Sequence, residues 1–78
     1  MFVRFKTLSD ATIYVNPFTV QTVEKENYTE SRITFSIGEY SEIVVKGDLE
    51  TAVTRINNEA ERMLKKLGIG SVENLTIN

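Results

Sequence analysis

The sequence predicts an α+β fold, in which an antiparallel β-meander of four to five strands is followed by one long C-terminal α-helix packed on one face. Two observations support this prediction. Hydrophobic residues recur at every second position up to about residue 47, as in strands with one buried and one solvated face. From Asp48 onward the hydrophobic period becomes that of a helix. The 78 residues have the size of a single domain, with the meander over 1–47, the helix over 48–67 and a tail over 68–78.

Five stretches are expected to form strands, and the breaks between them carry turn residues. The alternation is clearest in 31–37, and the other expected strands are 2–6, 11–15, 19–24 and 42–46. In the third of these stretches Val20 and Val23 are three positions apart, which predicts a bulge. The breaks are short, so neighbouring strands should be antiparallel; they are Ser9-Asp10, Asn16-Pro17, 26–30 and 38–41.

The expected helix has a start signal and a stop signal. Asp48 is a good N-cap residue, and Gly68 is suited to the left-handed conformation that ends many helices. The tail that follows is read either as a short extra strand or as a disordered end. The positions expected to form the core are Val3, Phe5, Ile13, Val15, Val23, Ile33, Phe35, Ile37, Ile43, Val45, Leu49, Val53 and Ile56.

The apolar stripe of the expected helix suggests self-association. Its members recur at spacings of four and three from Leu49 to Leu67, a pattern that fits either cover of the chain's own sheet or a contact with a second helix. A helix of this length spans roughly 28 Å, whereas strands of five or six residues span about 17–20 Å. The end of the helix should therefore project beyond the sheet. We expect a homo-oligomer interface at Ala60, Met63, Leu64 and Leu67.

The composition argues against an enzyme. The chain contains no His and no Cys, which removes the usual proton shuttle, the common nucleophile systems and most metal ligands. Its carboxylates are scattered, and no glycine pattern suggests a phosphate loop. We therefore predict no catalytic residues, no cofactor and no metal site.

Two further surfaces are candidates for partner contact. Tyr28 and Tyr40 fall in expected loops, where tyrosine serves well as an anchor for another protein. A solvated sheet face could present the basic and aromatic side chains that single-stranded nucleic acid requires, namely Arg4, Lys6, Tyr14 and Arg32. The net charge of −2 argues against nucleic acid as a partner for the chain as a whole and gives no reason to expect a membrane partner.

Residues 1–58 resemble the small FlbD-type flagellar and swarming-motility proteins of bacteria. The similarity rests on Ile13-Tyr14-Val15-Asn16-Pro17, on Ile43-Val44-Val45-Lys46, and on Leu8, Val20, Val23, Gly38, Val53 and Ile56. The chain departs from the family at Ser9-Asp10, where an Asn-Gly turn is usual, and after residue 60. Similar short chains of unassigned role occur in phage and prophage genomes. The resemblance implies strands followed by a helix, and it implies no catalytic residues.

The sequence thus favours a non-enzymatic, homo-oligomeric protein-interaction module of bacterial or phage origin, one that regulates a host machine. The alternatives are a single-stranded nucleic-acid-binding protein that uses the sheet face, and a minor structural or assembly protein of a phage. The N-terminus does not resemble a signal peptide and no stretch has the length of a membrane helix, so the expected location is the cytoplasm, or the host cytoplasm for a phage-encoded chain.

Overall fold

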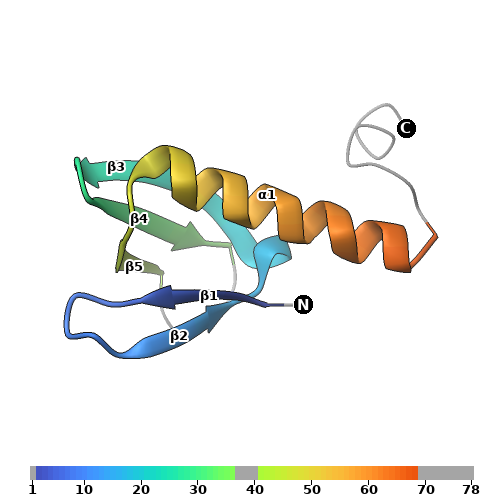
Figure 1. Ribbon diagram of the computed structural model, residues 1–78, viewed down its shortest axis with the longest axis horizontal. Helices are drawn as coiled ribbons and strands as arrows, with labels where there is room; N and C mark the ends of the chain where they lie inside the picture. The colour runs from blue at the N-terminus through green and yellow to red at the C-terminus, as the bar shows by residue number, and fades with distance from the viewer. Residues whose placement is uncertain (1, 37–40, 69–78) are drawn as a thin grey trace.

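The computed structural model describes residues 2–36 and 41–68 and has the predicted α+β architecture (Figure 1). All five expected strands are present, and one long helix follows them. The elements are β1 (Val3–Lys6), β2 (Thr12–Val15), the short 3-10 helix η1 (Pro17–Thr19), β3 (Val20–Asn27), β4 (Glu30–Phe35), β5 (Glu42–Lys46) and α1 (Leu49–Lys66). The predicted tail lies outside the described residues from position 69 onward.

The strands form two antiparallel sheets. β1 and β2 make a hairpin, and β3, β4 and β5 make a three-stranded meander. The chain leaves the hairpin at Asn16, whose side-chain oxygen accepts a hydrogen bond from the Phe18 N–H at 3.0 Å, and Pro17 begins η1. This turn separates β2 from β3, and within the described residues the two sheets are hydrogen-bonded to each other at one isolated bridge, between Thr7 and Val45.

The hairpin between β3 and β4 is tighter than the sequence predicts. β3 runs to Asn27 and β4 begins at Glu30, so the expected polar loop shrinks to Tyr28 and Thr29. The Asn27 side chain stabilises the turn, because its Oδ1 accepts a hydrogen bond from the Thr29 N–H at 3.0 Å. The expected bulge near the start of β3 is confirmed by a register shift between Val20 and Thr22.

The ends of α1 match the predicted start and stop signals. The Asp48 carboxylate caps the first turn by accepting a hydrogen bond from the Thr51 N–H at 3.2 Å. At the other end the Leu67 N–H donates to the Met63 carbonyl at 3.2 Å, and Gly68 has a φ of 77°. The predicted helix is therefore confirmed to within one residue.

The core lies between the two sheets and the first half of α1. The hairpin contributes Val3, Phe5 and Val15, the three-stranded sheet contributes Ile33 and Val45, and the helix contributes Ala52 and Ile56. Around this centre pack the half-buried side chains of Ile13, Val20, Val23, Phe35 and Ile43. The predicted core residues Leu49 and Val53 are only half-buried, since α1 turns Ala52 toward the sheets. Ile37 lies outside the described residues.

Candidate functional site

The second half of α1 extends beyond the strands, as Figure 1 shows. Of the expected oligomer interface, Leu67 is the most open, with 70% of its surface exposed. Ala60 and Met63 are half-buried. Leu64 is 4% exposed, although it does not belong to the central core cluster. The apolar surface left open on this stripe therefore centres on Leu67 and Met63.

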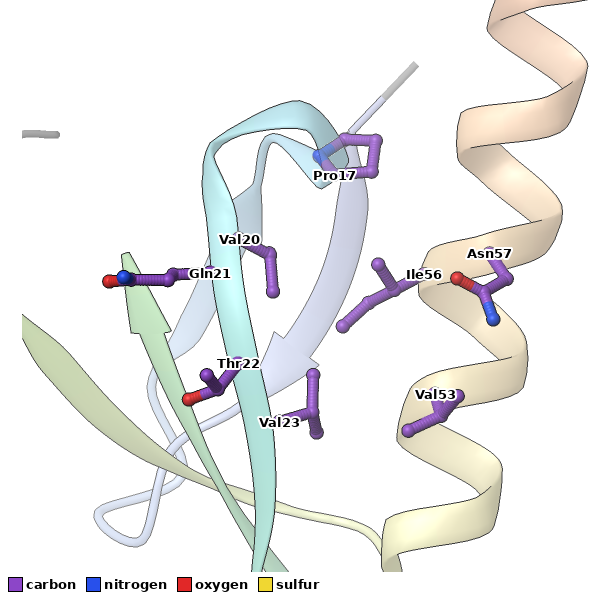
Figure 2. A pocket seen from close by; sticks show the side chains of 8 residues that line it. All are labelled: Pro17, Val20, Gln21, Thr22, Val23, Val53, Ile56 and Asn57. Carbon is purple, nitrogen blue, oxygen red and sulfur yellow. The ribbon is translucent and has the colours of Figure 1, made fainter. Parts of the chain in front are cut away.

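A second surface feature is a groove between α1 and β3, which is the edge strand of the three-stranded sheet. Figure 2 shows the side chains of Val20 and Val23 on one wall facing those of Val53 and Ile56 on the other. The groove has a volume of about 310 Å³, and its remaining lining residues are Pro17, Gln21, Thr22 and Asn57. None of these lining side chains ionises, so the groove offers contact surface and no acid–base chemistry.

A third feature lies where the hairpin, β5 and α1 meet, and we name it the basic hollow. Its volume is about 400 Å³, and it is lined by Arg4, Phe5, Lys6, Thr12, Lys46 and Arg55. Four of the six lining residues are cations, in a chain whose net charge is −2. The basic hollow is therefore a local concentration of positive charge in a mildly acidic protein.

The contacts in the basic hollow fix some of its cations and leave others open. The Arg55 guanidinium lies over the Phe5 ring, 4.6 Å from its centroid, and donates a hydrogen bond to the Arg4 carbonyl. Lys46 forms an ion pair with Asp10, and the Lys6 ammonium lies 3.5 Å from the Asp10 carbonyl oxygen. The hydrogen bond and positive charge of Lys46, together with the charge of Lys6, lower the pKa of Asp10.

The expected nucleic-acid face is divided between the two sheets. Arg4 lies directly opposite Tyr14 across the hairpin, and Lys6 lies opposite Thr12, so all four occupy one face. Tyr14 is 66% exposed. Arg32 belongs to β4 in the other sheet, so the structure does not bring it together with the hairpin residues.

The surroundings of Arg32 explain why it does not join the basic hollow. Its guanidinium lies 2.6 Å from a Glu26 carboxylate oxygen and 3.9 Å from one of Glu42, so its charge is balanced within its own sheet. In its stead, Lys46 and Arg55 are the cations that lie beside Arg4 and Lys6. No local signal identifies them, because Arg55 lies 51 positions from its partner Arg4.

Of the two tyrosines expected to contact a partner, Tyr28 belongs to the described residues. Tyr28 forms the turn between β3 and β4 and is 84% exposed. The Lys25 ammonium lies 3.9 Å from the centroid of its ring, so one face of the ring already contacts a cation. Tyr40 lies outside the described residues.

Over residues 2–36 and 41–68 no group of three or more acidic residues has a geometry that could hold a metal ion. The helix found in this part of the chain lacks the apolar length needed to cross a bilayer. No family model, no curated protein and no solved structure matches the chain.

Proposed function

We propose that this protein is a non-enzymatic interaction module that associates with copies of itself through the second half of α1. The observation that carries the proposal is that α1 leaves the two sheets before its apolar stripe ends (Figure 1). Leu67, the last apolar residue of the stripe, is 70% exposed, and Met63 lies one turn before it. An apolar stripe that outlasts its own sheet is typical of a helix that packs against a second helix.

The energetics favour a modest association. Full burial of a side chain such as leucine or methionine contributes about 1.5–3 kcal/mol. In a two-fold dimer each contact occurs twice, so Leu67 and Met63 from both copies would all lose solvent exposure together. Part of this gain is offset by the entropy cost of association. We therefore expect a dimer or small ring whose population depends on protein concentration.

The proposal can be tested by measuring the solution mass by light scattering on a sizing column over a concentration series. The wild-type mass should rise above that of the monomer. Leu67→Asp and Met63→Asp should each return it to the monomer, because each places a charge in the contact. The matched control is Leu8→Asp, since Leu8 is also exposed, at 52%, but lies in the turn of the hairpin.

Two results would contradict the proposal. One is a wild-type mass that stays monomeric at every concentration. The other is an oligomer that persists in both α1 variants or dissociates equally in the Leu8 control. Far-UV circular dichroism of each variant shows that a change in mass does not come from unfolding.

A further inference from the structure

The positive charge of the basic hollow is only partly balanced by nearby acids. Among the residues that the structure describes, Asp10 is the one carboxylate paired with a cation of the hollow. Arg4, Lys6, Lys46 and Arg55 together with Asp10 leave a local excess of about three positive charges. Like charges that converge on one concave surface repel each other, so the arrangement is suited to a bound anion.

Two of the cations are held in place and two are open. Arg55 is fixed by the Phe5 ring and the Arg4 carbonyl, and Lys46 is fixed by Asp10. Within the described residues the Arg4 guanidinium makes no ion pair, and the contact of the Lys6 ammonium is with a backbone carbonyl at 3.5 Å. Arg4 and Lys6 are thus the side chains available to a ligand.

Exposed aromatic rings flank these open cations. Tyr14 lies across the hairpin from Arg4 on the same face. Phe2, 54% exposed, lines an adjoining hollow that also includes Arg4 and Arg55. The one acid in that lining, Glu59, forms an ion pair with Arg62 at 3.1 Å, so it does not reduce the excess of positive charge. A simple anion such as phosphate would use the cations alone. Cations interleaved with exposed rings are what proteins use to bind single-stranded nucleic acid, by contacting phosphates and stacking bases.

We propose that the basic hollow binds the phosphates of a single-stranded nucleic acid, with Arg4 and Lys6 as the phosphate contacts and Tyr14 as a stacking platform for a base. This site uses none of the residues of the self-association surface. Because a positive patch attracts a polyanion locally, the net charge of −2 weakens binding but does not prevent it at low salt. Two phosphate contacts predict a slope of log K against log salt of about −1.4.

The test is a titration of a fluorescein-labelled oligothymidylate of about twelve nucleotides with the full chain, followed by fluorescence anisotropy between about 50 and 200 mM salt. Arg4→Gln should reduce the slope by about 0.7 and weaken binding roughly eightfold at 50 mM salt. Arg32→Gln makes the same change in net charge on the other sheet, so it should leave binding unchanged.

A second pair of variants tests the stacking role. Tyr14→Ser should weaken binding by about fivefold or more with little change in the salt slope, because a ring contributes stacking and carries no charge. Tyr28→Ser removes a still more exposed ring, in the turn between β3 and β4, and should have no effect. Circular dichroism confirms that each variant keeps its fold.

Several outcomes would overturn the proposal. They are the absence of binding at 50 mM salt, equal losses for Arg4→Gln and Arg32→Gln, and a salt slope near zero. Competition by tripolyphosphate as effective as competition by the oligonucleotide, with no loss for Tyr14→Ser, would show a site for small anions and would also count against it. Binding that survives Leu67→Asp would separate this result from the self-association proposal.

Discussion

The two halves of α1 carry one continuous apolar stripe, yet their surroundings differ. In the first half Ala52 and Ile56 are buried against both sheets. In the second half Leu64 is also buried, but Leu67, which follows directly after α1, is 70% exposed where the helix projects past the strands. The comparison teaches that a periodic stripe defines which face of a helix is apolar but not what covers that face. The length of the strands decides where the cover ends.

The two ends of the helix differ in the same way. The start is tied to the meander, because the Gly47 N–H donates to the Thr29 carbonyl at 2.7 Å and the Ser31 hydroxyl donates to the Gly47 carbonyl at 2.8 Å. At the end, the backbone hydrogen bonds of Leu67 and Gly68 go to carbonyls of the last turn of α1 itself. The start of α1 should therefore be coupled to global unfolding, whereas its last turn can open on its own.

The largest expected difference between the two halves of α1 is in the loss of unfolding free energy when an apolar side chain in each is truncated. Ile56→Ala should lower the free energy of unfolding by about 2–5 kcal/mol, because it leaves a cavity in the core. Leu67→Ala should change it by less than about 0.5 kcal/mol in dilute monomer, because this side chain is already solvated. Urea denaturation of both variants measures the contrast, and equal losses would show that the second half is as well covered as the first.

A smaller difference is expected in the stability cost of replacing each of the two glycines that flank α1 with alanine. Gly47 has a φ of 133° and Gly68 a φ of 77°, and a Cβ added at either would meet no atom within 4 Å. The cost of alanine is therefore one of backbone conformation alone. Gly47→Ala should cost about 1–3 kcal/mol, because its φ lies outside the left-handed well.

Gly68→Ala is the matched variant at the free end of the helix. It should cost about 1 kcal/mol in the local conformation and less in global stability, because the last turn can open separately. Urea denaturation gives the global cost, and hydrogen exchange of the amides in the last turn gives the local one. A global loss larger at Gly68 than at Gly47 would reverse the comparison.

The order of the elements could be predicted from the sequence, but the assembly of the charged surface could not. The alternation of residues 31–37, the Asn16-Pro17 break and the Asp48 cap are local signals. The structure has all three, with the alternation described as far as residue 36. The division into two sheets depends on which strands become neighbours, as in the bridge between Thr7 and Val45. No local period encodes that choice.

Long-range placement also explains the differences in the candidate surfaces. Arg32 has the strand phase expected of a solvated face, but it pairs with Glu26 and Glu42 in the three-stranded sheet. Arg55 reaches the hairpin from α1, 51 positions after its partner Arg4. Alternation identifies the face of a strand on which a side chain lies, but a site built from three separate elements requires the tertiary fold.

The buried hydroxyl of Ser31 provides a test of how firmly the start of α1 is tied to the sheet. Ser31 is fully buried, and its hydroxyl is hydrogen-bonded to the Gly47 carbonyl at 2.8 Å. Ser31→Ala should lower the free energy of unfolding by about 1 kcal/mol, because the half-buried Gly47 carbonyl loses its donor. Ser36→Ala removes an exposed hydroxyl that also bonds a backbone carbonyl, and it should change stability by much less. Equal losses of unfolding free energy for the two variants would mean that burial does not strengthen the hydrogen bond between Ser31 and Gly47.

The smallest effect is expected from acid, and it acts at the same end of α1. The hydrogen bonds from the Thr51 side chain and N–H lower the pKa of Asp48 below its ordinary value of 3.8. Because the folded pKa is lower than the unfolded one, the ionised cap stabilises the fold above pH 3.8, and this contribution is lost as the pH falls through the folded pKa. Asp48→Asn keeps a capping oxygen but cannot titrate, so its urea midpoint should fall less steeply below pH 4.

Asp10 complicates this measurement in a useful way, because its pKa is lowered by Lys46 and Lys6 and it links the turn of the hairpin to β5. Asp10→Asn should make the urea midpoint depend less on acid pH because it removes a titrating contact between the two sheets. Asp48→Asn should have the same effect because it removes a titrating group at the start of α1. If Asp48→Asn leaves the acid slope unchanged while Asp10→Asn flattens it, then the Ser31 and Gly47 hydrogen bonds hold the start of α1 without help from the cap. The contrast between the two ends of α1 would then depend on its tie to the meander alone.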